Sequence, residues 1–169
     1  MRQLSLLKND VLPSDIVYTP DNIALDIISF FKPTGKCLDP CRGDSAFYKY
    51  LPSGSEWCEI ADDRDFFNYN KSIDWIVGNP PYSIFADFLS HSFKLSSNVV
   101  YIVPTNKIFQ SFKIMDKIEN YGGIKAILVY GGGQRVGFPF GFSVGAFHFQ
   151  KDFKLNTKIV FRRITSRCK

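Results

Sequence analysis

Long apolar runs are absent from this sequence. No stretch approaches the ~18 consecutive apolar residues that a membrane-spanning helix requires. The first residues, Met1 to Ser5, also lack the apolar core of a secretory signal peptide. These absences argue against an integral membrane protein and against a secreted one, so we expect a cytoplasmic protein with no membrane partner.

Cysteine is scarce and is not arranged for metal binding. The four cysteines, Cys37, Cys41, Cys58 and Cys168, form no C-x-x-C pair and are too few for a disulfide scaffold. We therefore expect reduced thiols and no metal site. A complete G-x-G-x-x-G fingerprint and a phosphate-binding lysine after a glycine-rich turn are also missing, which argues against the common dinucleotide and nucleoside triphosphate sites.

Size and composition fit one compact domain over residues 1–169. The chain is 45% hydrophobic and 22% charged, enough to bury a core, and nothing suggests a second domain. The net charge of +5 is concentrated near the end, where residues 151–169 hold seven basic residues and one acidic one. Such a basic tail either contacts a phosphate backbone or forms a solvated end, and charge alone does not separate the two.

Short apolar runs alternate with helical patterns along the chain. This alternation predicts an α/β domain, with a parallel sheet covered by helices on both faces. Strands are expected at residues 36–39, 57–60, 74–77, 98–103, 124–130 and 143–149. Helices are expected at residues 21–31 with Asp21 as N-cap, at 45–51, at 84–95, and through the apolar positions Ile108, Phe112, Met115 and Ile118.

The loop between the last two expected strands is rich in glycine and phenylalanine. Residues 131–142 hold five glycines and three phenylalanines. Backbone freedom combined with flat aromatic surface is more typical of a ligand-facing edge than of a passive turn.

The sequence Asn79-Pro80-Pro81-Tyr82 directly follows the apolar run 74–77. The carboxyl ends of parallel strands are where open α/β sheets bind ligands. An sp2 amino nitrogen is a poor nucleophile because its lone pair is delocalised. Acceptors aimed at its hydrogens, here the Asn79 side-chain oxygen and the Pro80 carbonyl, would favour the positive charge that develops as a methyl group arrives. The two prolines stiffen the loop, and Tyr82 can stack on a planar substrate.

A second segment, residues 38–47, predicts a strand, a turn of small residues and a helix start. Its backbone can approach a ligand closely, and a helix N-terminus flanked by Asp39 suits a carboxylate with an amino group, such as the methionine end of S-adenosylmethionine. Glu59, at the end of the second expected strand, is placed to accept both ribose hydroxyls. Asp65 and Phe66 could hold an adenine by a hydrogen bond and a ring contact.

Taken in order, these segments resemble the gamma-order amino-methyltransferases that modify adenine in DNA. That family has a Thr-Pro pair, an Asp-Pro-x-x-Gly-x-Gly turn, a strand-end acid, an Asp-Phe pair and an Asn-Pro-Pro-Tyr loop. The corresponding positions here are Thr19-Pro20, the turn from Asp39, Glu59, Asp65-Phe66 and the loop from Asn79. Residues 57–82 also resemble phage-borne members, which would place the protein in the host cytoplasm.

The resemblance implies a doubly wound, mostly parallel, seven-stranded Rossmann-like domain that binds S-adenosylmethionine. It implies transfer of a methyl group to N6 of adenine in DNA, with the base flipped out against Tyr82. The implied catalytic residues are Asn79, Pro80, Pro81 and Tyr82. The implied cofactor-binding residues are Tyr18, Thr19, Pro20, Asp39, Pro40, Gly43, Ser45, Glu59, Asp65, Phe66 and Asn79. An aromatic of the later loop, Phe138 or Phe140, is expected on the other face of the base.

Two features depart from the family pattern. Ser45 stands where the third small residue of the turn is normally glycine, and the chain leaves no room for a separate target-recognition domain. A short enzyme could act on loosely specified DNA or RNA, or depend on a recognition subunit or on a second copy of itself. Cytosine N4, a protein glutamine amide, and a non-catalytic descendant that binds nucleic acid or a partner are the alternative functions.

Overall fold

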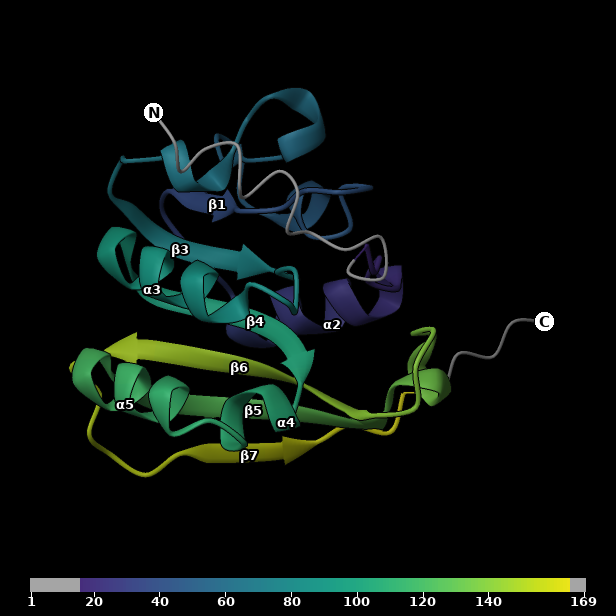
Figure 1. The fold of residues 1–169 in the computed structure, drawn as a ribbon. Coiled ribbons are helices and arrows are strands. Elements are labelled where there is room, and N and C mark those ends of the chain that lie inside the picture. Colours follow the sequence, from purple (N-terminus) through teal and green to yellow (C-terminus); the bar gives the residue numbers. More distant parts are fainter. Residues whose placement is uncertain (1–15, 165–169) are drawn as a thin grey trace.

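The computed structural model describes residues 16–164, which form a sheet with helices on both faces (Figure 1). The seven strands of this part lie in the order β2-β1-β3-β4-β6-β5-β7. β6 is antiparallel to its neighbours β4 and β5, and the other adjacent pairs are parallel. The strands are β1 (Cys37–Asp39), β2 (Glu56–Trp57), β3 (Ile73–Gly78), β4 (Ser96–Pro104), β5 (Gly122–Gly132), β6 (Ser143–Lys151) and β7 (Lys158–Phe161). The predicted doubly wound, mostly parallel sheet is confirmed.

Helix α2 (Asp21–Phe31) covers one face of the sheet, and α3 (Phe85–Leu95), α4 (Asn106–Phe109) and α5 (Phe112–Tyr121) cover the other (Figure 1). Strand β4 shows why both faces need a cover. Val99, Tyr101 and Val103 pack into the cluster under α3 and α5, whereas Val100 and Ile102 pack into the cluster under α2. A strand that is apolar on both faces belongs inside a helix-covered sheet.

The predicted helix at residues 45–51 is wrong. The chain makes a turn here and then a single 3-10 helix, η2 (Tyr48–Tyr50). Gly43 and Ser45 both have positive φ, 51° and 72°, and two left-handed residues so close together prevent a regular helix from starting. Ser45 therefore holds the strained conformation that glycine adopts more readily.

The predicted N-cap Asp21 is also displaced by one position. Pro20 occupies the N-cap and Asp21 is the first helical residue. The Asp21 carboxylate accepts a hydrogen bond from the Tyr50 hydroxyl at 2.7 Å and pairs with Lys49. It thereby ties α2 to η2.

The apolar stripe expected through Ile108, Phe112, Met115 and Ile118 belongs to two helices rather than one. Ser111 is extended, with φ −122° and ψ 114°, so the chain breaks between α4 and α5 and the phase of the stripe changes. As a result Phe112 is 83% exposed, and Ile114, which lies off the predicted stripe, is buried.

The second strand is shorter than the predicted range 57–60. It spans Glu56–Trp57, and the chain then forms a small hairpin in which Glu59 bridges Arg64 around the 3-10 helix η3 (Ile60–Asp62). Glu59 therefore lies at the base of a turn beyond the strand.

The basic stretch 151–169 is more than a tail, because its described part, residues 151–164, includes a strand of the sheet. Its residues 158–161 form β7, which pairs parallel to β5. Arg162 forms an ion pair with Asp26 at 3.1 Å, and the Lys154 ammonium donates to the backbone oxygens of Glu119 and Gly122. Three of the basic residues thus belong to β7 or contact the domain itself: Lys154, Lys158 and Arg162. Arg167 and Lys169 lie outside the described residues.

Between residues 16 and 164, no helix combines the length and apolar character needed to cross a membrane.

Candidate active site

The two predicted motifs meet where β1 and β3 end side by side. Leu38 of β1 is paired with Ile76 of β3, so Asp39 and Gly78 reach the same edge of the sheet. A Cβ atom on Gly78 would lie 2.9 Å from Pro40 Cδ and 3.1 Å from Asp39 Oδ1. The turn after β1 and the corner after β3 therefore touch, and only glycine leaves the space for that contact.

Replacing Gly78 by alanine should separate the two motifs. The added methyl group has no free space, so we expect a loss of roughly 1–3 kcal/mol in the free energy of unfolding, typical of an overpacked site. Urea denaturation measures it. Gly141→Ala is the matched control, because a Cβ atom there meets no neighbouring atom and the φ of Gly141 is not left-handed. Gly54→Ala is unsuitable as a control, because Gly54 has φ +84° and alanine would be strained there. Equal stability of the Gly78 variant and wild type would contradict the close contact.

A cavity of about 410 Å³ lies against both motifs. Ligand sites for small molecules are typically hollows of roughly 300–1,000 Å³. The predicted site residues that line it are Tyr18, Pro40, Gly43, Glu59, Asp65, Phe66, Asn79 and Pro81. The structure thus collects eight predicted residues from five separate segments around one hollow. The lining residues that sequence reasoning missed are Ile16, Val17, Cys41, Arg42, Ile60, Ala61, Asp62, Phe67, Ile84 and Phe88.

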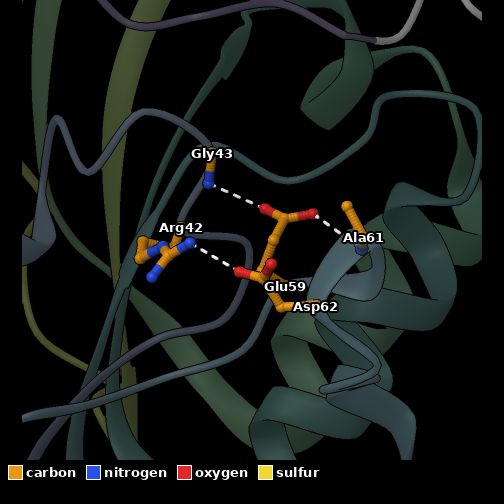
Figure 2. Close-up of polar contacts among 5 residues, drawn as sticks. All are labelled: Arg42, Gly43, Glu59, Ala61 and Asp62. Atoms are coloured by element: carbon orange, nitrogen blue, oxygen red, sulfur yellow. Dashed lines mark hydrogen bonds and ion pairs between the residues drawn. The ribbon is translucent and has the colours of Figure 1, made fainter.

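Glu59 joins the turn at Gly43 to the segment at Ala61 (Figure 2), and all three residues line the first cavity. Its Oε2 accepts the Gly43 N–H at 2.8 Å, and its Oε1 accepts the Ala61 N–H at 3.3 Å. Beside it, Arg42 Nη2 donates to Asp62 Oδ2 at 2.6 Å, joining the same two segments. The predicted strand-end acid therefore holds the small-residue turn in place.

Arg42 also packs on Trp57. The guanidinium carbons of Arg42 and Arg64 each lie 3.8 Å from the centre of a Trp57 ring. Cation–π contacts of this kind contribute roughly 0.5–2 kcal/mol. Arg42 stood within the turn segment recognised in the sequence, but only the fold shows that it connects that turn to β2 and Asp62.

Asn79 is oriented by the N-terminal segment. Its Nδ2 donates to the Val17 carbonyl at 2.9 Å, and among residues 16–164 its buried Oδ1 accepts no hydrogen bond. The carbonyl partner requires the amide nitrogen, so the oxygen is the atom left with acceptor capacity. The Cys41 thiol donates to the Asn79 backbone oxygen at 3.0 Å, which adds a second link between the motifs. A buried acceptor without a partner calls for an explanation such as a bound ligand.

Asp39 does not line the cavity, although the next two residues, Pro40 and Cys41, do. Its side chain is 1% exposed, and its Oδ1 accepts the Cys41 N–H at 3.3 Å. Burial raises the pKa of this carboxyl group from 3.8 to about 7, because desolvation disfavours its charged form.

The shift makes stability depend on pH. The unfolded chain loses the Asp39 proton near pH 3.8, whereas the folded protein keeps it up to about pH 7. Between those values the folded state binds more protons, so stability falls as pH rises and then stays level above pH 7. At about 1.4 kcal/mol per pH unit, the loss is about 4 kcal/mol. Urea titrations of wild type and Asp39→Asn between pH 4 and pH 8 should diverge across this window, and parallel curves would contradict the assignment.

Tyr82 lines a second cavity of about 510 Å³ on the other side of the corner. Phe140 contacts the Tyr82 ring edge-on, with centroids 6.0 Å apart, and lines this cavity together with Phe142. The other lining residues are Val17, Pro104, Asn106, Lys107 and Pro139. The glycine- and phenylalanine-rich loop therefore borders a hollow, next to the predicted base-stacking tyrosine.

Several predicted residues do not line either cavity. Phe138 is 3% exposed and packs in the core beneath Phe140, which makes it a support rather than a contact surface. Thr19 is 6% exposed, and its hydroxyl oxygen has no hydrogen-bond partner among the described residues. The remaining predicted residues outside the cavity linings are Pro20, Asp39, Ser45 and Pro80.

Asp65 and Phe66 have structural partners as well as a place at the first cavity. Asp65 Oδ1 accepts the Phe67 N–H at 2.9 Å and so caps a short 3-10 helix. The Phe66 ring stacks on Phe88 with centroids 4.9 Å apart. Within residues 16–164, no group of three or more His, Cys, Asp or Glu side chains is arranged to hold a metal ion.

Comparison with solved structures shows what kind of fold surrounds these cavities. A candidate class I S-adenosylmethionine-dependent methyltransferase from Listeria monocytogenes matches 97% of this chain and 71% of its own, at 14% identity and a TM-score of 0.64. A candidate RNA methyltransferase from Pyrococcus horikoshii matches 80% of this chain and 86% of its own, at 17% identity and a TM-score of 0.63. The chain has the Rossmann-like methyltransferase fold.

This methyltransferase fold extends to subunits of larger assemblies. The methyltransferase subunit of a type I restriction-modification system from Streptococcus thermophilus matches 86% of this chain at 14% identity and a TM-score of 0.60, and this chain covers 47% of it. No family model and no curated protein sequence matches the chain. At these identities the likeness establishes the fold.

Proposed function

We propose that this chain transfers a methyl group from S-adenosylmethionine to an exocyclic amino group of a nucleobase, with N6 of adenine in DNA as the target. One observation carries the proposal. The Asn79-Pro80-Pro81-Tyr82 corner stands between two cavities, with Asn79 and Pro81 lining the first and Tyr82 lining the second. A methyl donor on one side and an amino acceptor on the other would meet at this corner.

The first cavity has the chemistry to hold the cofactor. Its volume of about 410 Å³ suits a ligand of that size. The Gly43 turn, with φ 51°, presents backbone rather than side chain. The ammonium group of the cofactor is proposed to reach the buried Asp39 carboxyl group, which precedes the lining residue Pro40. When bound, S-adenosylmethionine would supply the methyl group: the substrate nitrogen would bond to the methyl carbon with its own lone pair, and the electrons of the broken C–S bond would stay on sulfur.

Glu59 and Asp65 would hold the nucleoside part of the cofactor. Each Glu59 oxygen accepts one backbone N–H, and a carboxylate oxygen retains a further lone pair for a ribose hydroxyl. Asp65 Oδ2 is likewise available while Oδ1 caps Phe67. Phe66, which lines the same cavity, supplies an apolar contact for the adenine ring.

Asn79 would act on the substrate amino group. Its Oδ1 accepts one amino hydrogen, and the Pro80 carbonyl is proposed to accept the other. Because the Val17 carbonyl already fixes the Asn79 amide, the oxygen needs no reorganisation as positive charge develops on the nitrogen. The two acceptors would stabilise the positive charge on the nitrogen once it has bonded to the methyl carbon, and the nitrogen would then release a proton to solvent.

The solved structures support this reaction class and a nucleic-acid target. Their names include S-adenosylmethionine-dependent, RNA and restriction-modification methyltransferases. Because some of these neighbours are subunits of restriction-modification systems, we propose that another subunit or a second copy of this chain takes part in target recognition.

The test is methyl transfer itself. The chain is incubated with S-adenosylmethionine carrying a tritiated methyl group and with unmethylated DNA, and the digested nucleosides are separated. We expect label in N6-methyladenine. Parallel reactions with RNA and with protein extract define the target class, and label confined to either of them would overturn the DNA assignment. Absence of label from all three, together with no calorimetric binding of S-adenosylmethionine, would overturn the proposed function.

A further inference from the structure

The three phenylalanines of the loop between β5 and β6 form a stacked ladder. The Phe138 and Phe140 rings are 5.3 Å apart at 26°, and the Phe140 and Phe142 rings are 5.1 Å apart at 24°. Exposure rises along the ladder, from 3% at Phe138 through a half-buried Phe140 to 56% at Phe142. The ladder therefore begins in the core and ends with a large aromatic side chain facing solvent.

The backbone around the ladder is fixed. Gly133 N–H donates to the Phe142 carbonyl at 2.8 Å, and Phe138 N–H donates to the Gly133 carbonyl at 3.0 Å. A Cβ atom on Gly133 would lie 2.8 Å from the Phe140 ring, so the loop closes tightly around that ring. Phe142 is thus held in one place before any ligand arrives, which lowers the entropy cost of binding.

Phe142 borders the second cavity together with a cation and an unsatisfied amide. Asn106 and Lys107, at the start of α4, line the same hollow. Among the described residues, the buried Asn106 Oδ1 accepts no hydrogen bond. A ligand that enters here would meet an aromatic ring, a hydrogen-bond acceptor and an ammonium group.

This combination matches the chemistry of an unpaired nucleotide. Base–aromatic stacking suits the flat ring, an N–H of the base or a ribose hydroxyl suits the amide oxygen, and a phosphate suits the lysine. In a duplex, the bases next to a flipped nucleotide stay stacked on their neighbours and cannot reach an aromatic side chain. Exposed aromatics beside basic groups are the usual means of holding unstacked, single-stranded nucleic acid.

We propose that Phe142 is a stacking platform for an unpaired nucleobase adjacent to the target, and that the substrate is single-stranded nucleic acid, either a free strand or an open loop. This inference rests on the proposed function and specifies its substrate class. Asn106 contacts the edge of the stacked nucleotide, and Lys107 contacts a neighbouring phosphate.

The test compares binding of labelled oligonucleotides to the intact chain by fluorescence anisotropy. The probes are single-stranded DNA, single-stranded RNA and double-stranded DNA of one sequence. Whichever single strand binds more tightly shows whether the unpaired nucleotide comes from DNA or from RNA. We expect both single strands to bind more tightly than the duplex. Phe142→Ala should weaken single-strand binding roughly tenfold, and Phe142→Tyr should retain it because the flat ring remains.

Phe112→Ala is the matched control. Phe112 is more exposed than Phe142, at 83%, but does not line the cavity, so its loss should leave binding unchanged. Duplex binding as tight as single-strand binding, or a Phe142→Ala variant with wild-type affinity, would overturn the platform. If the stacking platform is overturned in this way but the duplex is still methylated, the proposed function holds and only the platform is wrong. If S-adenosylmethionine does not bind and no probe is methylated, the proposed function fails as well.

Discussion

Replacing Asn79 by alanine should lower kcat for methyl transfer by roughly 10²–10³-fold and leave the dissociation constant of S-adenosylmethionine nearly unchanged. The variant loses the buried Oδ1, which has no hydrogen-bond partner among the described residues and is proposed to accept an amino hydrogen. Single-turnover rates with tritiated cofactor give the chemical step, and calorimetric titration gives cofactor affinity. The rate should fall while cofactor affinity stays unchanged, because the proposed partner of Asn79 Oδ1 is the substrate and not the cofactor.

Asn79→Asp is the matched control for this prediction. Aspartate retains a side-chain oxygen in nearly the same volume but cannot donate to the Val17 carbonyl. We expect activity between those of wild type and the alanine variant. A parallel fall in cofactor affinity and in rate for Asn79→Ala would place Asn79 in the cofactor site instead.

Replacing Asp39 by asparagine should weaken S-adenosylmethionine binding roughly 10- to 100-fold at pH 8, the range expected for loss of a hydrogen bond to a charged group. Burial raises the pKa of Asp39 to about 7, so the wild-type carboxyl group is ionised at pH 8 and protonated at pH 6. Wild-type affinity for the cationic ammonium group should therefore increase as pH rises through 7. The asparagine variant has no such group to titrate.

Calorimetric titrations at pH 6, 7 and 8 check both parts of the Asp39 prediction. Asp44→Asn is a useful control because Asp44 belongs to the same turn but is exposed, whereas Asp39 is buried. Wild-type affinity that is level across this pH range, or a pH dependence that persists in Asp39→Asn, would mean that another group receives the ammonium.

The sequence predicted the regular parts of this fold well because hydrophobic periodicity reports directly on burial. The helices at residues 21–31 and 84–95 and the central strands lie within one or two residues of their predicted limits. Hydrophobic periodicity carries no information about the sign of the backbone φ angle. The positive φ angles of Gly43 and Ser45 therefore could not be predicted, and the pattern indicated a helix where the chain turns.

Strand β7 shows a second limit. The high positive charge of residues 151–169 predicted a basic tail, but four of these residues form a strand. The signal that could have revealed it is the run Ile159-Val160-Phe161, two β-branched residues followed by an aromatic one.

The candidate site was predictable where a motif stood at a strand end, because the ends of parallel strands share one edge of the sheet. Asn79 reaches the first cavity as this rule predicts, whereas Glu59 lies at that cavity beyond the end of β2 and Asp39 is buried outside its lining. Contacts between segments that are distant in the sequence have no local motif from which they could be predicted. The Val17 carbonyl that holds Asn79, and the packing of Arg42 on Trp57, are examples that emerge only from the fold.

Val17 borders both cavities, and its carbonyl holds the amide of Asn79. The two hollows consequently share a boundary and are not independent compartments. A shift of Val17 would therefore change the lining of both hollows and the hydrogen bond to Asn79 together. If the cofactor and the substrate occupy the two hollows as proposed, a ligand that displaces Val17 in one hollow would also alter the other, and the two binding equilibria would be thermodynamically linked.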